Sequence, residues 1–284
     1  MSKGIYKSDA AAQRIAGKYA ELLRHWPLER EERDIDTRHG RSRVIVSGKR
    51  DNPPLLLFHP ANINSVYWLR QVQAYAASHR VYAVDLIGEA GGSAPERPRF
   101  KGPALSEWLE DLANGLELER TALVGASLGA WMCLRFACNW PERVERLALI
   151  SPPGIVRQRR ARSFVGSLAT LLSGPLGSRM IYKSQLRQSG MEAHLQDAFM
   201  LARRQLRQWG KAPRFSDREL GQLYCPVLLI VGGRDPWFDS EALTLRAVRA
   251  IPQLEVNFRS REGHFPSDFT REVDRFLVSH YARD

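Results

Sequence analysis

The chain has 284 residues, of which 44% are hydrophobic and 9% aromatic, enough for a sizeable core in one large domain or two small ones. No stretch of about eighteen apolar residues occurs, which excludes a transmembrane helix, and residues 1–18 lack the apolar segment of a signal peptide. The three cysteines have no metal-ligand spacing, so we expect buried thiols in a cytoplasmic protein that needs no metal or cofactor.

The formal net charge is +11, and almost all of it falls in one segment. Residues 155–215 contain twelve lysines and arginines but only two acids, Glu192 and Asp197, for a net +10. This charge fits an anionic substrate or an acidic carrier protein as partner, and it fits equally an arginine-rich solvated surface. No nucleic-acid motif or aromatic stripe accompanies it, which argues against nucleic acid as a partner.

The N-terminal region predicts a helix followed by a hairpin. Ile15, Tyr19, Leu22 and Trp26 recur at helical spacing before Pro27. Two short alternating runs then follow at residues 34–37 and 42–46.

From residue 54 onwards, buried strands alternate with helices. A continuous apolar run predicts a buried strand at residues 54–58, and further strands are predicted at residues 80–87, 121–125, 146–151, 226–231 and 254–258. Helical patterns occupy residues 65–77, 101–116 and 130–139, and a final helix carries Phe269, Val273 and Phe276. This alternation predicts a mostly parallel central sheet with helices on both faces.

One long stretch interrupts the alternation, because residues 152–223 show helical and irregular patterns but no strand. A plain loop of this length is uncommon, so we expect a helical cap inserted over the sheet. The predicted organisation is an N-terminal helical extension (1–32), a core (33–151 and 224–284) and the cap (152–223).

The segment Gly125-Ala126-Ser127-Leu128-Gly129 is the main functional signal. A strand, then G-x-S-x-G, then a helix is the pattern of a nucleophile elbow, a tight turn that exposes the central serine. Alone, the pentapeptide also fits a serine in an ordinary glycine-rich loop.

A serine nucleophile needs a base, and the base needs an orienting acid. Asp235 follows the strand at 226–231, and His264 lies on a glycine-flanked loop after the last strand. Of the alternatives, Asp239 suits a helix cap, His280 suits the surface of a terminal helix, and residues 152–160 contain no acid. The order Ser127, Asp235, His264 predicts a catalytic triad.

These motifs resemble the α/β-hydrolase family, and Asp85, Gly88 and Ser93 lie in a loop similar to one common in that family. The helix ending in Trp26-Pro27, with the hairpin after it, is similar to a subgroup of bacterial serine carboxylesterases.

The resemblance also implies an oxyanion hole built from the N–H groups of Leu128 and Ala61. Family members usually have His-Gly after the third strand, whereas this chain has His59-Pro60, and proline has no N–H to donate. His59 fits a structural role or a substrate contact.

We therefore expect a serine hydrolase that cleaves a small-molecule ester or thioester through an acyl-enzyme intermediate. A thioesterase for carrier-bound acyl groups, a carbon–carbon bond hydrolase and a non-catalytic ligand sensor stay open. A serine nucleophile disfavours haloalkane dehalogenases and epoxide hydrolases. Asn62, Trp68 and Trp131 are the expected substrate contacts, although aromatic residues at such positions also fit the core.

Overall fold

The computed structural model describes residues 4–158 and 167–279. Its centre is an eight-stranded sheet in the order β1-β2-β4-β3-β5-β6-β7-β8. The strands are β1 Glu31–Ile35, β2 Ser42–Ser47, β3 Pro54–Phe58, β4 Arg80–Val84, β5 Thr121–Ala126, β6 Val144–Ile150, β7 Val227–Gly232 and β8 Leu254–Arg259. The β1–β2 and β2–β4 pairs are antiparallel, whereas the pairs from β4 through β3 to β8 are parallel. The predicted hairpin and the mostly parallel sheet are both confirmed.

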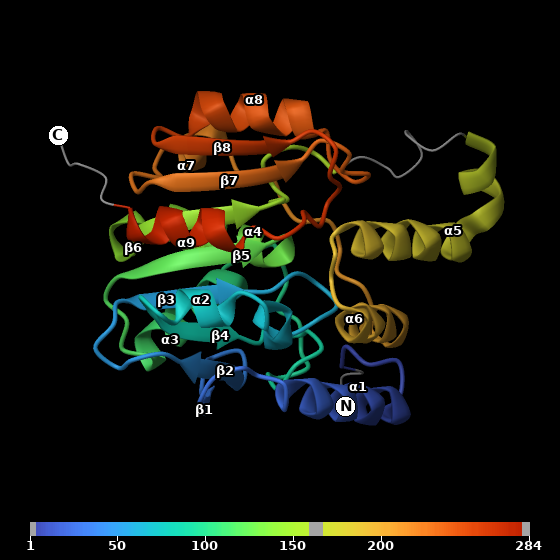
Figure 1. Cartoon of the computed structure of the whole chain (residues 1–284), viewed down its shortest axis with the longest axis horizontal. Coiled ribbons are helices and arrows are strands. Elements are labelled where there is room, and N and C mark those ends of the chain that lie inside the picture. The colour runs from blue at the N-terminus through green and yellow to red at the C-terminus, as the bar shows by residue number, and fades with distance from the viewer. Residues whose placement is uncertain (1–3, 159–166, 280–284) are drawn as a thin grey trace.

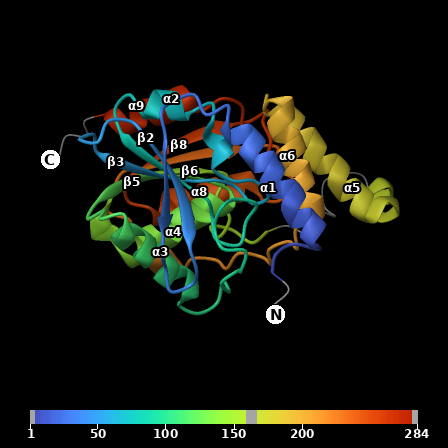
Figure 2. The same cartoon turned by 90° about the horizontal axis from the view of Figure 1, so that it is seen from below.

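Helices cover both faces of the sheet (Figures 1 and 2). Helices α3 Ala104–Gly115, α4 Leu128–Asn139 and α8 Ser240–Ala250 pack on one face, together with Leu56 and Phe58 of β3. Helices α2 Val72–Tyr75 and α9 Thr270–Val278 pack on the other, with Leu55 and Leu57. Neighbouring β3 residues thus face opposite core clusters, which is why the strand reads as a continuous apolar run.

Two expected helices are wrong in extent. The stretch at 65–77 is not one helix but a 3₁₀ turn, η1 Ser65–Trp68, followed by the short α2. All four residues of η1 are buried, which a one-sided amphipathic helix on the sheet surface does not allow. The final helix begins at Thr270, because Phe269 is its N-cap residue and packs in the core instead.

Between β6 and β7 the described residues form α5 Ser167–Gln188, α6 Ala193–Gln205 and α7 Asp217–Leu220. The N-terminal helix α1 Asp9–Leu23 lies along α6, and α6 lies between α1 and α5 beyond the carboxyl ends of the strands (Figures 1 and 2). Tyr6 and Leu206 add an antiparallel β-bridge between the two segments. Helices α1, α5 and α6 therefore share one layer. The short α7 packs on α8 instead.

No helix among residues 4–158 and 167–279 combines the length and the apolar character needed to cross a bilayer.

Candidate active site

Ser127 lies at the sharp turn between β5 and α4. Its backbone has φ 48° and ψ −115°, a conformation that L-residues rarely adopt, and its N–H donates to the Ile150 carbonyl at 2.8 Å. A Cβ at Gly125 would lie 2.5 Å from the Gly129 carbonyl oxygen, and a Cβ at Gly129 would lie 2.0 Å from the Phe58 oxygen. Both glycines are therefore required for this turn.

The side chains of Ser127, His264 and Asp235 form one hydrogen-bonded chain. His264 Nε2 lies 2.8 Å from Ser127 Oγ, and His264 Nδ1 lies 2.6 Å from Asp235 Oδ2. Since an ionised carboxylate only accepts, Nδ1 donates to Asp235 and Nε2 is left to accept from the serine hydroxyl. His264 is 4% exposed and Asp235 is 7% exposed, so the pair is shielded from water.

The Asp235 carboxylate is held in place by its own loop. Oδ1 accepts from the N–H groups of Trp237 at 2.7 Å and Phe238 at 3.2 Å, which leaves Oδ2 for the imidazole. The Trp237 ring meets the His264 ring edge-on at 4.7 Å, and Phe238 stacks on it at 5.8 Å. These contacts fix the plane of the imidazole.

Asp239, the other acid considered for the triad, caps a helix as expected. Asp239 is the N-cap of α8, and its side chain accepts from Ala242 N, which confirms the capping interpretation. His280 lies outside the described residues.

The two backbone N–H groups that the family resemblance implies for an oxyanion hole have no hydrogen-bond acceptor within residues 4–158 and 167–279. One belongs to Leu128, the first residue of α4, and the other to Ala61, in the loop after β3. An unpaired N–H at a helix start also carries the positive end of the helix dipole. Both groups are available to a ligand.

His59 is a structural residue, and the first of its two expected roles is confirmed. It has no exposed surface, its Nδ1 donates to the Pro60 carbonyl at 2.8 Å, and its Nε2 accepts from Leu86 N at 2.9 Å. Burial lowers the pKa of the imidazole to about 4, so the ring is neutral at neutral pH.

Of the three expected substrate contacts, Asn62 lies next to the Ala61 loop residue, whereas Trp68 and Trp131 lie in the core. Asn62 follows Ala61, and its N–H donates to Glu89 Oε2 at 2.7 Å. Trp68 and Trp131 have no exposed surface at all. Trp68 packs edge-on against Phe269, and Trp131 Nε1 donates to the Pro213 carbonyl at 3.0 Å. Expecting these two tryptophans to touch substrate was therefore wrong, since both are enclosed by core packing.

Two residues that sequence reasoning missed contact the loops of the site. Gln185, in α5, accepts a hydrogen bond from His264 N at 2.8 Å, and a Cβ at Gly263 would lie 1.9 Å from its Oε1. Glu89, after β4, binds the Ala61–Asn62 loop. Glu89 had a detectable signal, an acid between Gly88 and Gly91, whereas no local pattern singles out Gln185.

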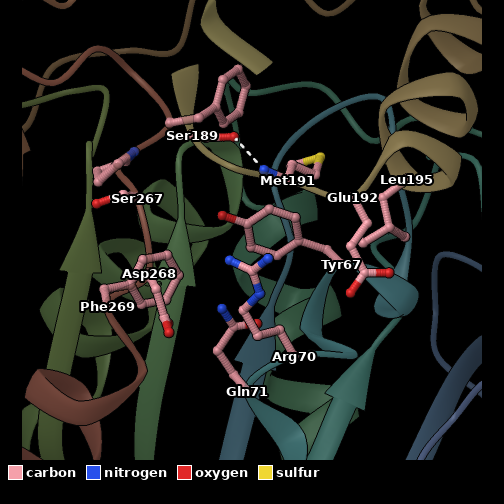
Figure 3. A pocket seen from close by; sticks show the side chains of 12 residues that line it. Tyr67, Arg70, Gln71, Ser189, Met191, Glu192, Leu195, Ser267, Asp268 and Phe269 are labelled. Carbon is pink, nitrogen blue, oxygen red and sulfur yellow. Dashed lines mark hydrogen bonds between the residues drawn. The ribbon is translucent and has the colours of Figure 1, made fainter. Parts of the chain in front are cut away.

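A cavity of about 40 Å³ lies where the cap meets the core (Figure 3). Its lining includes Tyr67 and Gln71 from the core side, Met191 and Leu195 from the cap side, and Phe265. Ser127 is not among the lining residues. Within the described ranges, no cluster of three His, Cys, Asp or Glu side chains is arranged to hold a metal ion.

Comparison with known proteins groups this chain with hydrolases. The sequence model of the alpha/beta hydrolase fold matches residues 53–269. Carboxylesterase YbfK of Bacillus subtilis (strain 168) is 29% identical over 270 residues, covering 88% of this chain and 86% of YbfK.

Solved structures of two carboxylesterases also resemble this chain. The crystal structure of carboxylesterase CesB (YbfK) from Bacillus subtilis matches with a TM-score of 0.78 at 25% identity, covering 96% of this chain and 100% of that one. Naproxen esterase (carboxylesterase NP) from Bacillus subtilis matches with a TM-score of 0.81 at 26% identity, covering 95% of this chain and 98% of that one.

Proposed function

The chain belongs to the α/β-hydrolase family and is a carboxylesterase-like enzyme of it, and on that basis we propose that Ser127, His264 and Asp235 are its catalytic triad. The observation that carries the proposal is the continuous hydrogen-bonded chain from the Ser127 hydroxyl through His264 to Asp235, with links of 2.8 and 2.6 Å. The proposed reaction is hydrolysis of a carboxylic ester through an acyl-enzyme intermediate.

In this mechanism, Ser127 Oγ attacks the ester carbonyl carbon while His264 Nε2 takes the hydroxyl proton. The carbonyl electron pair moves to oxygen, and this oxyanion accepts hydrogen bonds from Leu128 N and Ala61 N, each worth about 3 kcal/mol of barrier lowering. When the intermediate collapses, His264 gives the proton to the departing alkoxide. A water molecule, deprotonated by His264, then cleaves the acyl-enzyme and restores Ser127.

The same proposal places the substrate between the carboxyl edge of the sheet and a cap made from the insertion between β6 and β7. Asn62 and Trp237 are the proposed contacts for the acyl group, because they neighbour the oxyanion donor Ala61 and the base His264. The domain division proposed for the chain follows from this: residues 33–151 and 224–284 as the core, 152–223 as the cap and 1–32 as the N-terminal extension.

Replacing Ser127 with Ala tests the assignment. Hydrolysis of p-nitrophenyl acetate should fall by about 10⁴-fold or more, while the thermal unfolding midpoint stays close to that of the wild type. Treatment with a fluorophosphonate should add one adduct mass to the wild type and none to Ser127→Ala. Wild-type turnover by Ser127→Ala would overturn the proposal.

A second candidate, a thioesterase for acyl groups on an acidic carrier protein, is favoured by the charge of the cap. Among the part of it that the structure describes, the exposed basic residues include Arg157, Arg179, Lys183, Arg187, Arg204, Arg207, Lys211 and Arg214. Turnover of a carrier-borne thioester should collapse between about 50 and 500 mM NaCl, because screening shortens the reach of these charges. Turnover of a neutral ester should barely change. Equal salt dependence for both substrates would remove this candidate.

A further inference from the structure

Glu89 is a buried carboxylate that the proposed mechanism leaves unused. It follows β4, and its side chain has no exposed surface. Oε2 accepts from Asn62 N at 2.7 Å, and Oε1 accepts from Arg97 Nη2 at 3.0 Å and from Trp209 Nε1. Burial raises the pKa of Glu89, and the guanidinium of Arg97 opposes that rise. Three donors converge on the two oxygens, an arrangement that suits an ionised carboxylate.

The contact with Asn62 bears directly on Ala61. Asn62 has φ 67°, a left-handed conformation that asparagine adopts more readily than most residues other than glycine. Its N–H belongs to the Ala61–Asn62 peptide plane, so the Glu89 carboxylate holds that plane in position. On the other side of Ala61, the Pro60 carbonyl is held by His59. Because the chain has no cis peptide in its described residues, the Ala61 N–H points opposite to that carbonyl. Ala61 is thus held from both sides.

Glu89 also connects this loop to the insertion between β6 and β7. Trp209, which lies in the insertion after α6, donates to Glu89, and the Arg97 guanidinium lies 4.8 Å from the centroid of the Trp209 ring. Arg97 Nη1 donates in addition to the Arg207 carbonyl. The same carboxylate therefore contacts the loop that carries Ala61 and a side chain of the cap.

We propose that Glu89 is a positioning residue: its carboxylate, shared between Asn62 N–H and Trp209 of the cap, keeps the Ala61 N–H aimed at the oxyanion that develops during catalysis. The inference rests on the proposed function, since it needs Ser127 as the nucleophile. It makes the alignment of one oxyanion donor dependent on the position of the cap.

Glu89→Gln is the first test, because glutamine keeps the size of the side chain but offers one acceptor oxygen and turns an NH₂ group toward donors. We expect kcat for p-nitrophenyl acetate to fall by about 10- to 100-fold with KM within about twofold, since a displaced oxyanion donor affects the transition state more than substrate binding. Glu96→Gln, at an exposed neighbour, is the matched control and should leave both constants unchanged.

Hydrogen exchange supplies a direct readout of the loop. The amide of Asn62, followed by mass spectrometry in a peptide spanning residues 60–63, should exchange at least about tenfold faster in Glu89→Gln than in the wild type, because it loses its acceptor. A peptide from α4 should exchange at the same rate in both proteins. Trp209→Phe, which removes the Nε1 donor, should also lower kcat and speed the exchange of the Asn62 amide, both by less than Glu89→Gln does. If Glu89→Gln does not fold, Trp209→Phe tests the inference in its place.

Active-site titration with a fluorophosphonate separates positioning from a purely structural role. If the variant has fewer titratable sites but a normal kcat per site, or if kcat and Asn62 exchange match the wild type, the inference is wrong. Failure of the proposed function would look different, because the wild type itself would neither turn over the ester nor be labelled at Ser127.

Discussion

Gln185 Oε1, from the cap helix α5, accepts a hydrogen bond from the backbone N–H of His264 at 2.8 Å. The contact is buried, since Gln185 is 9% exposed, and it is so close that any side chain at residue 263 would have to displace the glutamine amide. Together with the Trp209–Glu89 contact, it gives the insertion between β6 and β7 one hydrogen bond to each side of the candidate site. The insertion between β6 and β7 is thus bonded to the loop that bears His264 and, through Glu89, to the loop that bears Ala61.

Gln185→Ala should lower kcat for p-nitrophenyl acetate by about tenfold. The buried His264 N–H loses its acceptor, a loss that costs about 1–3 kcal/mol, and the loop is expected to shift to find another partner and carry the imidazole with it. Gln188→Ala, at an exposed position of the same helix, is the control and should behave as the wild type. Equal kcat values for the two variants would show that the contact does not position His264.

Asp235→Asn should reduce kcat by about 10⁴-fold at neutral pH with little effect on stability. Asn must keep its oxygen toward Trp237 N and Phe238 N, so its NH₂ group faces His264 Nδ1. Nδ1 then has to accept, the proton moves to Nε2, and the ring can no longer accept from Ser127. Steady-state kinetics and a thermal melt measure both parts of the expectation.

The matched control for that change is Asp239→Asn, because asparagine caps a helix as well as aspartate does. It should keep wild-type activity. If Asp235→Asn also kept it, Asp235 would not be the acid of the triad.

Gly129→Ala should destabilise the fold by about 3 kcal/mol or more, or prevent folding altogether. The new methyl group would lie 2.0 Å from the Phe58 carbonyl oxygen and 2.7 Å from that of His59, and neither backbone can retreat without disturbing β3. Gly17→Ala, in α1 with no heavy atom within 4 Å of the added carbon, should instead stabilise the protein by about 1 kcal/mol. Urea denaturation of both variants measures whether the unfolding free energy falls for Gly129→Ala and rises for Gly17→Ala.

The neutral His59 predicts a loss of stability in acid. Its pKa is about 4 in the folded chain and 6.5 for a solvent-exposed imidazole, so below pH 6.5 the unfolded state binds a proton that the folded state does not. The contribution of neutral His59 to the unfolding free energy is fully present above pH 6.5. It declines by about 3 kcal/mol as the pH falls toward 4.

His59→Gln isolates that contribution, because glutamine can donate to Pro60 and accept from Leu86 but does not titrate. Between pH 7 and pH 4 the variant should lose about 3 kcal/mol less unfolding free energy than the wild type, measured by urea denaturation at each pH. Parallel curves for the two proteins would contradict a neutral buried imidazole.

Several features of this protein were predictable from short windows of its sequence. Continuous apolar runs identified buried strands, and the glycines around Ser127 marked a turn that no other residue tolerates. Asp235 and His264 follow strands β7 and β8, and parallel strands bring their carboxyl ends to one edge, so chain order alone predicted that they meet Ser127. The extent of the helices was less predictable, because the break between η1 and α2 depends on burial from several sides.

The amino-acid sequence by itself determined the sheet, the turn at Ser127 and the order of the proposed triad residues, because each depends on local periodicity or on a backbone conformation that few residue types accept. Only the tertiary structure decided that Trp68 and Trp131 are enclosed in the core, that α1 joins the cap layer, and that Gln185 and Glu89 hold the two loops of the site. These outcomes depend on contacts between segments far apart in the chain, and such contacts leave no periodic signal in either segment alone.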